Sequence, residues 1–250
     1  MHLAENFEAL FSLASLISLL TLSILEIVLG IDNIIFVSII AAKLPRNQQK
    51  KARTVGLSLA LIMRIALLFS ISWVIGLKDP LFFVMDFGAT GRDLILFSGG
   101  IFLLMKTTLE IHNKIEGHDE SERNIKKVTL RSIVFQIVFI DIIFSFDSIL
   151  TAVGLVSNIL IMVLAVIIAM FIMLAFSEKV SDFINKNPTI KMLALAFLLM
   201  IGMLLLLDAF HIHVPKEFVY FSMAFSFLVE FLNMRMHRKG ANRKKLPKNQ

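Results

Sequence analysis

The sequence predicts an all-α membrane protein with seven transmembrane helices, arranged as two inverted three-helix repeats plus a C-terminal helix. Three observations predict this fold: a high apolar content, apolar segments long enough to cross a bilayer, and one motif that occurs twice. Of the 250 residues, 57% are hydrophobic and 18% are charged, and the mean hydropathy is +0.82. A soluble domain is about half apolar and roughly a quarter charged, so lipid is the expected solvent for most of this chain.

Apolar segments divide the chain into spans, because a helix needs about 20 apolar residues to cross roughly 30 Å of hydrocarbon. The predicted spans are 16–42, 55–77, 94–111, 132–156, 159–177, 191–210 and 217–234. The expected domains are an interfacial segment (1–15), repeat 1 (16–111), a charged cytoplasmic loop (112–131), repeat 2 (132–210), the seventh span (217–234) and a basic cytoplasmic tail (235–250). The first span lacks the basic leader of a signal peptide, so we expect the mature protein to keep it.

Basic residues predict the orientation. Twenty of the 25 Lys and Arg residues lie in the segments 43–53, 112–131, 178–191 and 235–250, and three lie in the alternate loops, at Lys78, Arg92 and Lys216. Because positive charge collects in cytoplasmic loops, we expect the N-terminus outside and the C-terminus in the cytoplasm. The net charge of +6 therefore indicates orientation and not nucleic-acid binding. We expect the tail 235–250 to be disordered and to contact anionic lipid.

One motif occurs twice: an acid, five residues, an aspartate and a small hydrogen-bonding residue. The two copies consist of Glu26, Asp32 and Asn33, and of Asp141, Asp147 and Ser148. The copies lie three spans apart, so they cross the membrane in opposite directions. Inverted repeats of this kind are typical of secondary transporters, which bind substrate near the midplane.

Counting at 1.5 Å per residue places all four acids near the centre of the bilayer. In each copy the first acid, the residue four later and the residue seven later form one polar stripe, with the second acid 100° away. The middle positions of the stripes are Gly30 and Ser145. We expect local unwinding at one of them to turn both acids of a helix toward one cavity.

Buried acids need a cation or protons, because a lone intramembrane carboxylate costs about 2.5–3.5 kcal/mol. One alternative is a set of inert salt bridges with Arg64 and Lys106, but two basic groups cannot neutralise four acids. We expect Arg64 to be the internal counter-charge and Lys106 to reach toward the cytoplasmic interface. The third span ends at Glu110 as the sixth ends at Asp208, which makes Glu110 a further counter-charge or gating candidate.

The expected metal site is made of oxygen ligands only. Its candidate ligands are Glu26, Asp32, Asn33, Asp141, Asp147 and Ser148. With no cysteine in the chain and no histidine in the spans, these ligands suit Mn²⁺, Mg²⁺ or Ca²⁺ better than Cu⁺ or Zn²⁺. Protonation of the acids would weaken binding, which offers a route to proton exchange. We expect no permanently bound cofactor and no catalytic residue.

Two smaller features concern packing and loops. The sequence Ser98-Gly99-Gly100 in the third span predicts close packing of two helices. The two histidines between the sixth and seventh spans, His211 and His213, are interpreted as loop residues and not as metal ligands.

Several stretches resemble the TerC family of bacterial membrane proteins. They are Leu25–Phe36, Asp141–Ser148, Thr151–Leu155, His213–Lys216, Tyr220-Phe221 and Val229–Asn233. The resemblance covers residues 16–235, and the chain is similar to the short YgdQ-type members of the family. The resemblance implies a LysE-like transporter fold in the bacterial inner membrane and export of Mn²⁺, carried by the acids of the first and fourth spans.

The leading hypothesis is a secondary transporter that exports a divalent cation by alternating access. One alternative is a membrane adaptor that supports assembly of other membrane or exported proteins. The other is an intramembrane enzyme, since paired aspartates can perform acid–base hydrolysis. Protease, zinc-helix and Ser/His signatures are missing from the sequence, so we do not expect an enzyme.

Overall fold

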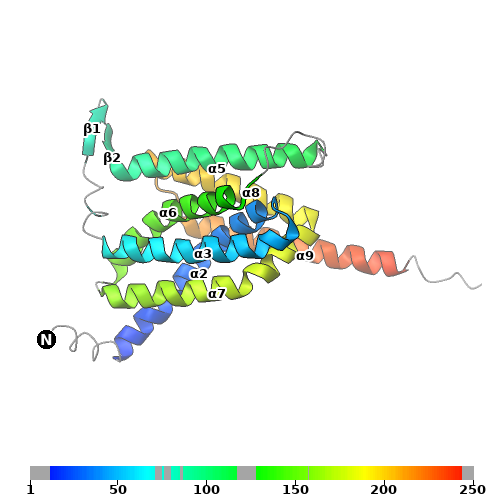
Figure 1. The fold of residues 1–250 in the computed structure, drawn as a ribbon, viewed down its shortest axis with the longest axis horizontal. Helices are drawn as coiled ribbons and strands as arrows, with labels where there is room; N and C mark the ends of the chain where they lie inside the picture. The colour runs from blue at the N-terminus through cyan, green and yellow to red at the C-terminus, as the bar shows by residue number, and fades with distance from the viewer. Residues whose placement is uncertain are drawn as a thin grey trace, which may run out of the picture.

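Long helices, most of them aligned along one common axis, make up the protein (Figure 1). The computed structural model describes residues 12–70, 75, 80–84, 87–116, 128–156 and 158–243. The elements are α2 (Leu13–Ala41), α3 (Arg46–Phe69), β1 (Pro80–Val84), β2 (Phe87–Thr90), α5 (Gly91–Ile115), α6 (Leu130–Leu155), α7 (Ile159–Lys186), α8 (Pro188–Ala209) and α9 (Lys216–Arg243). In Figure 1, α2 crosses the other helices obliquely, and α9 extends beyond them on the right.

Local sequence explains where several helices begin. Pro45 is the N-cap of α3, and Pro188 occupies the first turn of α8, where its missing N–H breaks no helical hydrogen bond. At the start of α5, Thr90 and Asp93 form a capping box, in which each side chain accepts a hydrogen bond from the other residue's backbone N–H. These signals separate helices that otherwise have similar apolar composition.

Five helices of the described chain are long and apolar enough to cross a membrane: α2, α3, α5, α7 and α8. Each coincides with a predicted span, and α6 and α9 coincide with the two remaining ones. The predicted second span, 55–77, began too late in the sequence, because α3 already starts at Arg46 and ends at Phe69. The long basic side chains in its first turns can extend toward the lipid headgroups, so the helix includes residues that were predicted to be a loop.

Two other predicted segments differ from the structure. The tail was predicted to be disordered from residue 235, but α9 continues as a helix to Arg243. Residues 80–84 and 87–90, which lie in a predicted loop, form the two antiparallel strands of a hairpin in which Phe83 lies opposite Gly88. The hairpin projects at the left end of the bundle in Figure 1. Of the predicted interfacial segment, residues 1–11 lie outside the described residues.

The helices pack in a crosswise pattern. The most extensive contacts pair α2 with α7, α5 with α8 and α3 with α6. The predicted close packing at Ser98-Gly99-Gly100 is confirmed, because a Cβ on Gly100 would lie 2.9 Å from the carbonyl oxygen of Gly202 in α8. Small residues let two backbones approach in this way where lipid supplies no hydrophobic drive.

The predicted local unwinding at Gly30 or Ser145 was wrong, since α2 and α6 run as continuous helices through both positions. Gly30 serves packing, because a Cβ there would collide with the Met173 sulfur of α7. Ser145 instead donates a hydrogen bond to Oδ2 of Asp141, 3.1 Å away.

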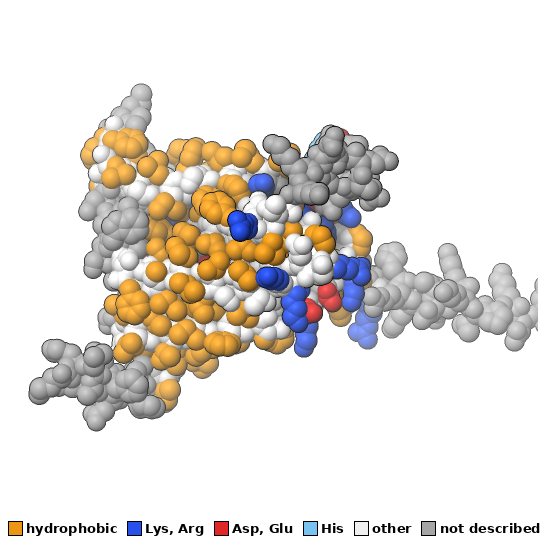
Figure 2. All heavy atoms as spheres, viewed as in Figure 1, with side chains coloured by type: hydrophobic (Ala, Val, Ile, Leu, Met, Phe, Trp, Pro, Cys, Tyr) orange, Lys and Arg blue, Asp and Glu red, His pale blue; other side chains and the backbone are white. Residues whose placement is uncertain are grey.

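The surface is divided by residue type. Figure 2 shows hydrophobic side chains over the sides of the bundle, and Lys and Arg gathered mainly at the end opposite the hairpin. Large apolar side chains such as Phe135, Phe171 and Phe221 are well exposed on these sides. Such a belt is stable only against lipid, because exposed apolar patches of this size are rare in soluble monomers.

We expect Gly100→Ala to lower the thermal unfolding temperature in detergent, because the new methyl group would push against the backbone of α8. Overpacking of this kind costs about 1–3 kcal/mol. Gly154→Ala is the matched control, since a Cβ at Gly154 meets no atom within 4 Å. Equal unfolding temperatures for the two variants would show that the α5–α8 contact is not tightly packed.

Candidate functional site

The guanidinium of Arg64 lies at the centre of a buried ion-pair network. Its Nε and Nη2 donate to Oδ2 and Oδ1 of Asp141 at 3.0 and 2.7 Å, and its Nη1 donates to Oε2 of Glu26 at 2.7 Å. The Arg64 residue is only 3% exposed, and both acids are equally buried. One side chain from α3 therefore binds α2 and α6 together, through the two-pronged geometry that suits guanidinium to carboxylate.

Polar residues of the two predicted stripes complete this network. Asn33 donates from Nδ2 to Oδ1 of Asp141 at 3.0 Å, while the Ser148 hydroxyl donates to the Ser145 carbonyl of its own helix at 3.2 Å. The first acid of the second motif thus contacts the last residue of the first motif. The Asn33 side-chain oxygen Oδ1 is buried and, among the described residues, has no hydrogen-bond partner. This oxygen is therefore available to a ligand.

The network is stable only as a unit. A charge in a low-dielectric interior needs a partner and further hydrogen bonds, and removal of one partner leaves an uncompensated charge. Two carboxylates and one guanidinium leave a net charge of −1 if both acids are ionised. A divalent cation or a proton could supply the missing positive charge.

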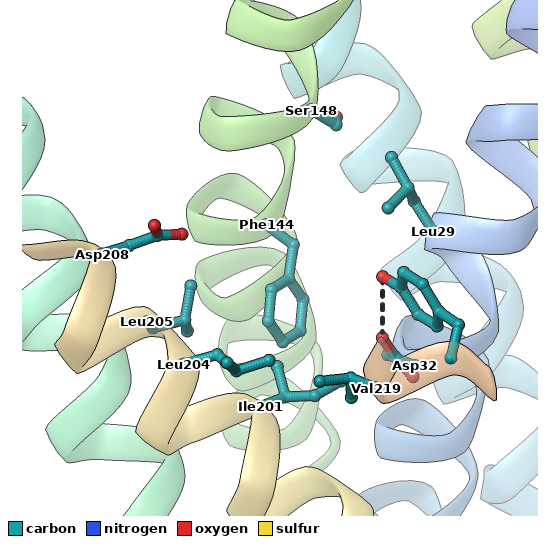
Figure 3. Close-up of a pocket in the computed structure, with 10 residues that line it drawn as sticks. Leu29, Asp32, Phe144, Ser148, Ile201, Leu204, Leu205, Asp208 and Val219 are labelled. Atoms are coloured by element: carbon teal, nitrogen blue, oxygen red, sulfur yellow. Dashed lines mark hydrogen bonds between the residues drawn. The ribbon is translucent and has the colours of Figure 1, made fainter. Parts of the chain in front are cut away.

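Asp32 lies on a different face of α2 from Glu26 and Asn33. Asp32 is 4% exposed, and it lines a cavity of about 50 Å³ together with Ser148, Asp208 and Tyr220. The Tyr220 hydroxyl donates to Oδ2 of Asp32 at 3.5 Å, as the dashed line in Figure 3 shows. The structure therefore separates the described predicted ligands: Glu26, Asn33 and Asp141 belong to the Arg64 network, whereas Asp32 and Ser148 line this cavity.

The remaining predicted ligand is Asp147, which belongs to α6, but its side chain lies outside the described part of the structure. Within the described residues, no group of three or more His, Cys, Asp or Glu is arranged to hold a metal ion. In this arrangement the Arg64 guanidinium is bound to the two carboxylates that a metal cation would need as ligands. A cation could bind Glu26 and Asp141 together only after Arg64 has moved.

The other predicted counter-charges lie apart from the network. Glu110 of α5 pairs with Lys43, at the end of α2, and with Lys191 of α8, at 3.8 Å. The Lys106 ammonium lies over the Phe102 ring, 5.8 Å from its centroid. Glu110 thus joins three helices near the basic end of the bundle, whereas Lys106 contacts its own helix.

At the opposite end, both loop histidines bind acids. His211 Nε2 lies 2.9 Å from Oδ2 of Asp93, and His213 Nδ1 lies 3.0 Å from Oδ1 of Asp208. From the sequence these histidines were expected to be loop residues, and Tyr220 was not expected to belong to a site. A lone tyrosine and a pair of loop histidines give no local signal of their distant partners.

Comparison with known proteins decides the family. The sequence pattern of the Integral membrane protein TerC family matches residues 11–245. The chain belongs to the TerC family. Its relative YgdQ, an inner membrane protein of Escherichia coli (strain K12), is 49% identical over 219 residues, which are 88% of this chain and 92% of YgdQ. A UPF0053 protein of Haemophilus influenzae is 46% identical over 224 residues, 89% of this chain and 94% of that protein.

A longer TerC-like relative is the Escherichia coli inner membrane protein YoaE, which is 49% identical over 221 residues. These residues are 88% of this chain but 43% of YoaE, so the chain spans less than half the length of that relative. No solved structure matches the chain. Family membership and the candidate spans together make the chain a multi-pass protein of the bacterial inner membrane.

We expect Arg64→Gln to destabilise this TerC family protein by about 3–5 kcal/mol, because the substitution leaves two buried carboxylates without a counter-charge. The measurement is the unfolding temperature in detergent without divalent metal. Lys106→Gln is the matched control, since it removes a half-buried cation whose ring contact contributes only about 0.5–1 kcal/mol. An Arg64→Gln protein as stable as the control would show that the network does not hold the helices together.

Proposed function

We propose that this chain is a secondary transporter that exports a divalent metal cation, Mn²⁺ in the first instance, from the bacterial cytoplasm. The cation binds to carboxylate and amide oxygens near the midplane of the membrane. Proton uptake by the same carboxylates releases it, because a protonated acid is a poor metal ligand. The termini lie on opposite sides, with the N-terminus outside.

The observation that carries this proposal is the buried set of oxygens around Arg64. Glu26, Asn33 and Asp141 are all nine-tenths buried or more, and the Oδ1 of Asn33 has no partner within the described residues. Ionisable groups inside a membrane are rare, and they mark ion pathways. Oxygen ligands without sulfur or nitrogen favour hard cations such as Mn²⁺.

Arg64 gives the substrate-free state its charge balance. While no metal is bound, the guanidinium offsets the repulsion between Glu26 and Asp141, whose carboxylates it bridges. When a divalent cation arrives, it supplies two positive charges and Arg64 withdraws. The metal ion thus replaces the Arg64 guanidinium as the positive charge beside the two carboxylates, and few charges are left uncompensated at any stage of the cycle.

The crosswise contacts support two inverted repeats of α2-α3-α5 and α6-α7-α8. If α2 corresponds to α6, α3 to α7 and α5 to α8, the pairing of α2 with α7 is the same contact as that of α6 with α3. A hydrogen bond also joins the two copies of the motif, because Asn33 of the first copy donates to Asp141 of the second. Rocking of one repeat against the other around a fixed site is the usual basis of alternating access.

Transport should depend on Asp32, which lies outside the Arg64 network and whose replacement therefore leaves that network intact. In proteoliposomes we expect Asp32→Asn to lower Mn²⁺ transport by more than the roughly 10- to 100-fold loss of metal affinity typical of an outer-shell substitution. The neutral amide cannot balance a divalent ion in a low dielectric.

The matched control for this test is Asp182→Asn on α7, which removes a carboxylate that is 62% exposed and paired with Lys186. We expect this variant to transport Mn²⁺ at the wild-type rate. Full transport by Asp32→Asn, with both proteins inserted in the membrane, would show that the transported cation does not need Asp32.

The proposed orientation has a separate test. The basic residues gather at one end of the bundle (Figure 2), and this end should face the cytoplasm. We expect a C-terminal green fluorescent protein to fluoresce and a C-terminal alkaline phosphatase to be inactive. An active phosphatase fusion would place the C-terminus outside the cell and so contradict the proposed orientation, and the proposed transport would then be import.

A further inference from the structure

The cavity beside Asp32 extends between two acids. Figure 3 shows Asp32 and Asp208 on opposite sides of Phe144 and Leu205, and all four residues line the cavity. Asp208 is also bound by His213, whose side chain is 72% exposed. The cavity therefore leads from a buried acid near the Arg64 network toward the surface at the hairpin end of the bundle.

This cavity is closed to a hydrated ion. Its volume is about 50 Å³, and one water molecule takes roughly 30 Å³ in the liquid, so one or two waters fill it. Phe144, Ile201 and Leu204 make its walls apolar. A narrow apolar passage blocks ions until it widens and becomes wet.

Tyr220 closes the cavity on the side of α9. It is the single tyrosine of the chain, and its hydroxyl connects α9 to Asp32 of α2. At 3.5 Å this hydrogen bond is long, since hydroxyl–carboxylate bonds are usually about 2.5–2.7 Å. A bond of this length holds the two helices in place but is easily exchanged for a better partner of the carboxylate.

The attachment of α9 to the rest of the protein is slight. Within the described residues, α8 is the one helix against which α9 packs extensively, through a small cluster of Phe197, Val219 and Met223. Other side chains of α9, including Phe218 and Phe221, are more than two-thirds exposed. Lipid can cover these side chains equally well in several positions, so α9 can shift without loss of a large protein interface.

We propose that this cavity is the outward half of the cation pathway and that Tyr220 is its gating residue. The proposal rests on the function proposed above. A cation that reaches Asp32 takes over the carboxylate and displaces the Tyr220 hydroxyl. Without that bond α9 separates from α2, the cavity widens, and the Asp208 carboxylate receives the cation on its way out.

The absence of cysteine from the chain allows a direct test. A single cysteine at Leu205→Cys, on the cavity wall, is treated in proteoliposomes with a small cationic methanethiosulfonate reagent. We expect Tyr220→Phe to speed this modification by about fivefold or more, the factor that loss of one hydrogen bond of typical strength gives. In the wild-type background added Mn²⁺ should speed the modification, because it displaces the Tyr220 hydroxyl; in the Tyr220→Phe background, where the gate is already open, it should slow the modification by occupying the pathway.

Two controls keep the result specific. Ser222→Ala also removes a hydroxyl from α9, but one that donates to the Val219 carbonyl, and it should leave the rate unchanged. A cysteine at Leu103→Cys, fully buried between helices and absent from the cavity wall, should stay unmodified in both backgrounds.

The outcomes separate the gate from the function. If Tyr220→Phe leaves the modification rate unchanged while Asp32→Asn abolishes Mn²⁺ transport, the proposed function stands and the gate is refuted. If Tyr220→Phe speeds modification but Mn²⁺ has no effect on it in either background, the cavity opens without serving a cation, and the proposed pathway is refuted. If the wild-type protein itself moves no Mn²⁺ in proteoliposomes, the proposed function is refuted whatever the modification rates show.

Discussion

The ion pairs of Arg64 are the interaction on which the centre of the protein depends. One guanidinium binds Asp141 through two nitrogens and Glu26 through a third, so the rotations of α2, α3 and α6 about their own axes are fixed relative to one another. Apolar contacts alone would not fix these rotations so strongly, because one lipid-facing side chain can replace another at little cost. The polar stripes then face each other, and Asn33 reaches Asp141.

This constraint gives α2 two different polar faces. Toward α3 and α6 it presents Glu26 and Asn33, which are locked into the ion-pair network. Toward α8 and α9 it presents Asp32, which accepts a hydrogen bond from a tyrosine on a lightly attached helix. The first face is rigid, whereas the second can adapt and borders the cavity. A transport cycle needs both properties, since a site must be held in place while its surroundings open.

Hydrophobic length predicted where the helices lie, because a bilayer imposes one scale on every span. It could not place the ends of α3, where basic residues belong to the helix, or detect a hairpin whose short apolar strands carry no helical or alternating pattern. The repeated motif predicted the acids, yet a motif cannot say which face of a helix meets which neighbour. The sequence pointed to Arg64 as the counter-charge of the acids. Which acids it binds, the separate position of Asp32 and the hydrogen bond of Tyr220 could be read only from the packing of distant segments.

The order of the chain gives the Arg64 network a consequence for biogenesis. Glu26 precedes Arg64 by one helix, whereas Asp141 follows it by two, so during synthesis the ribosome delivers the acid of α2 first. An arginine at the centre of a lone helix costs about 2.5–3.5 kcal/mol to insert. A hairpin of α2 and α3 that already contains the Arg64–Glu26 pair would avoid part of that cost. The bidentate bond to Asp141 can form only after α6 is made, so the order of synthesis also sets the order in which the site is assembled.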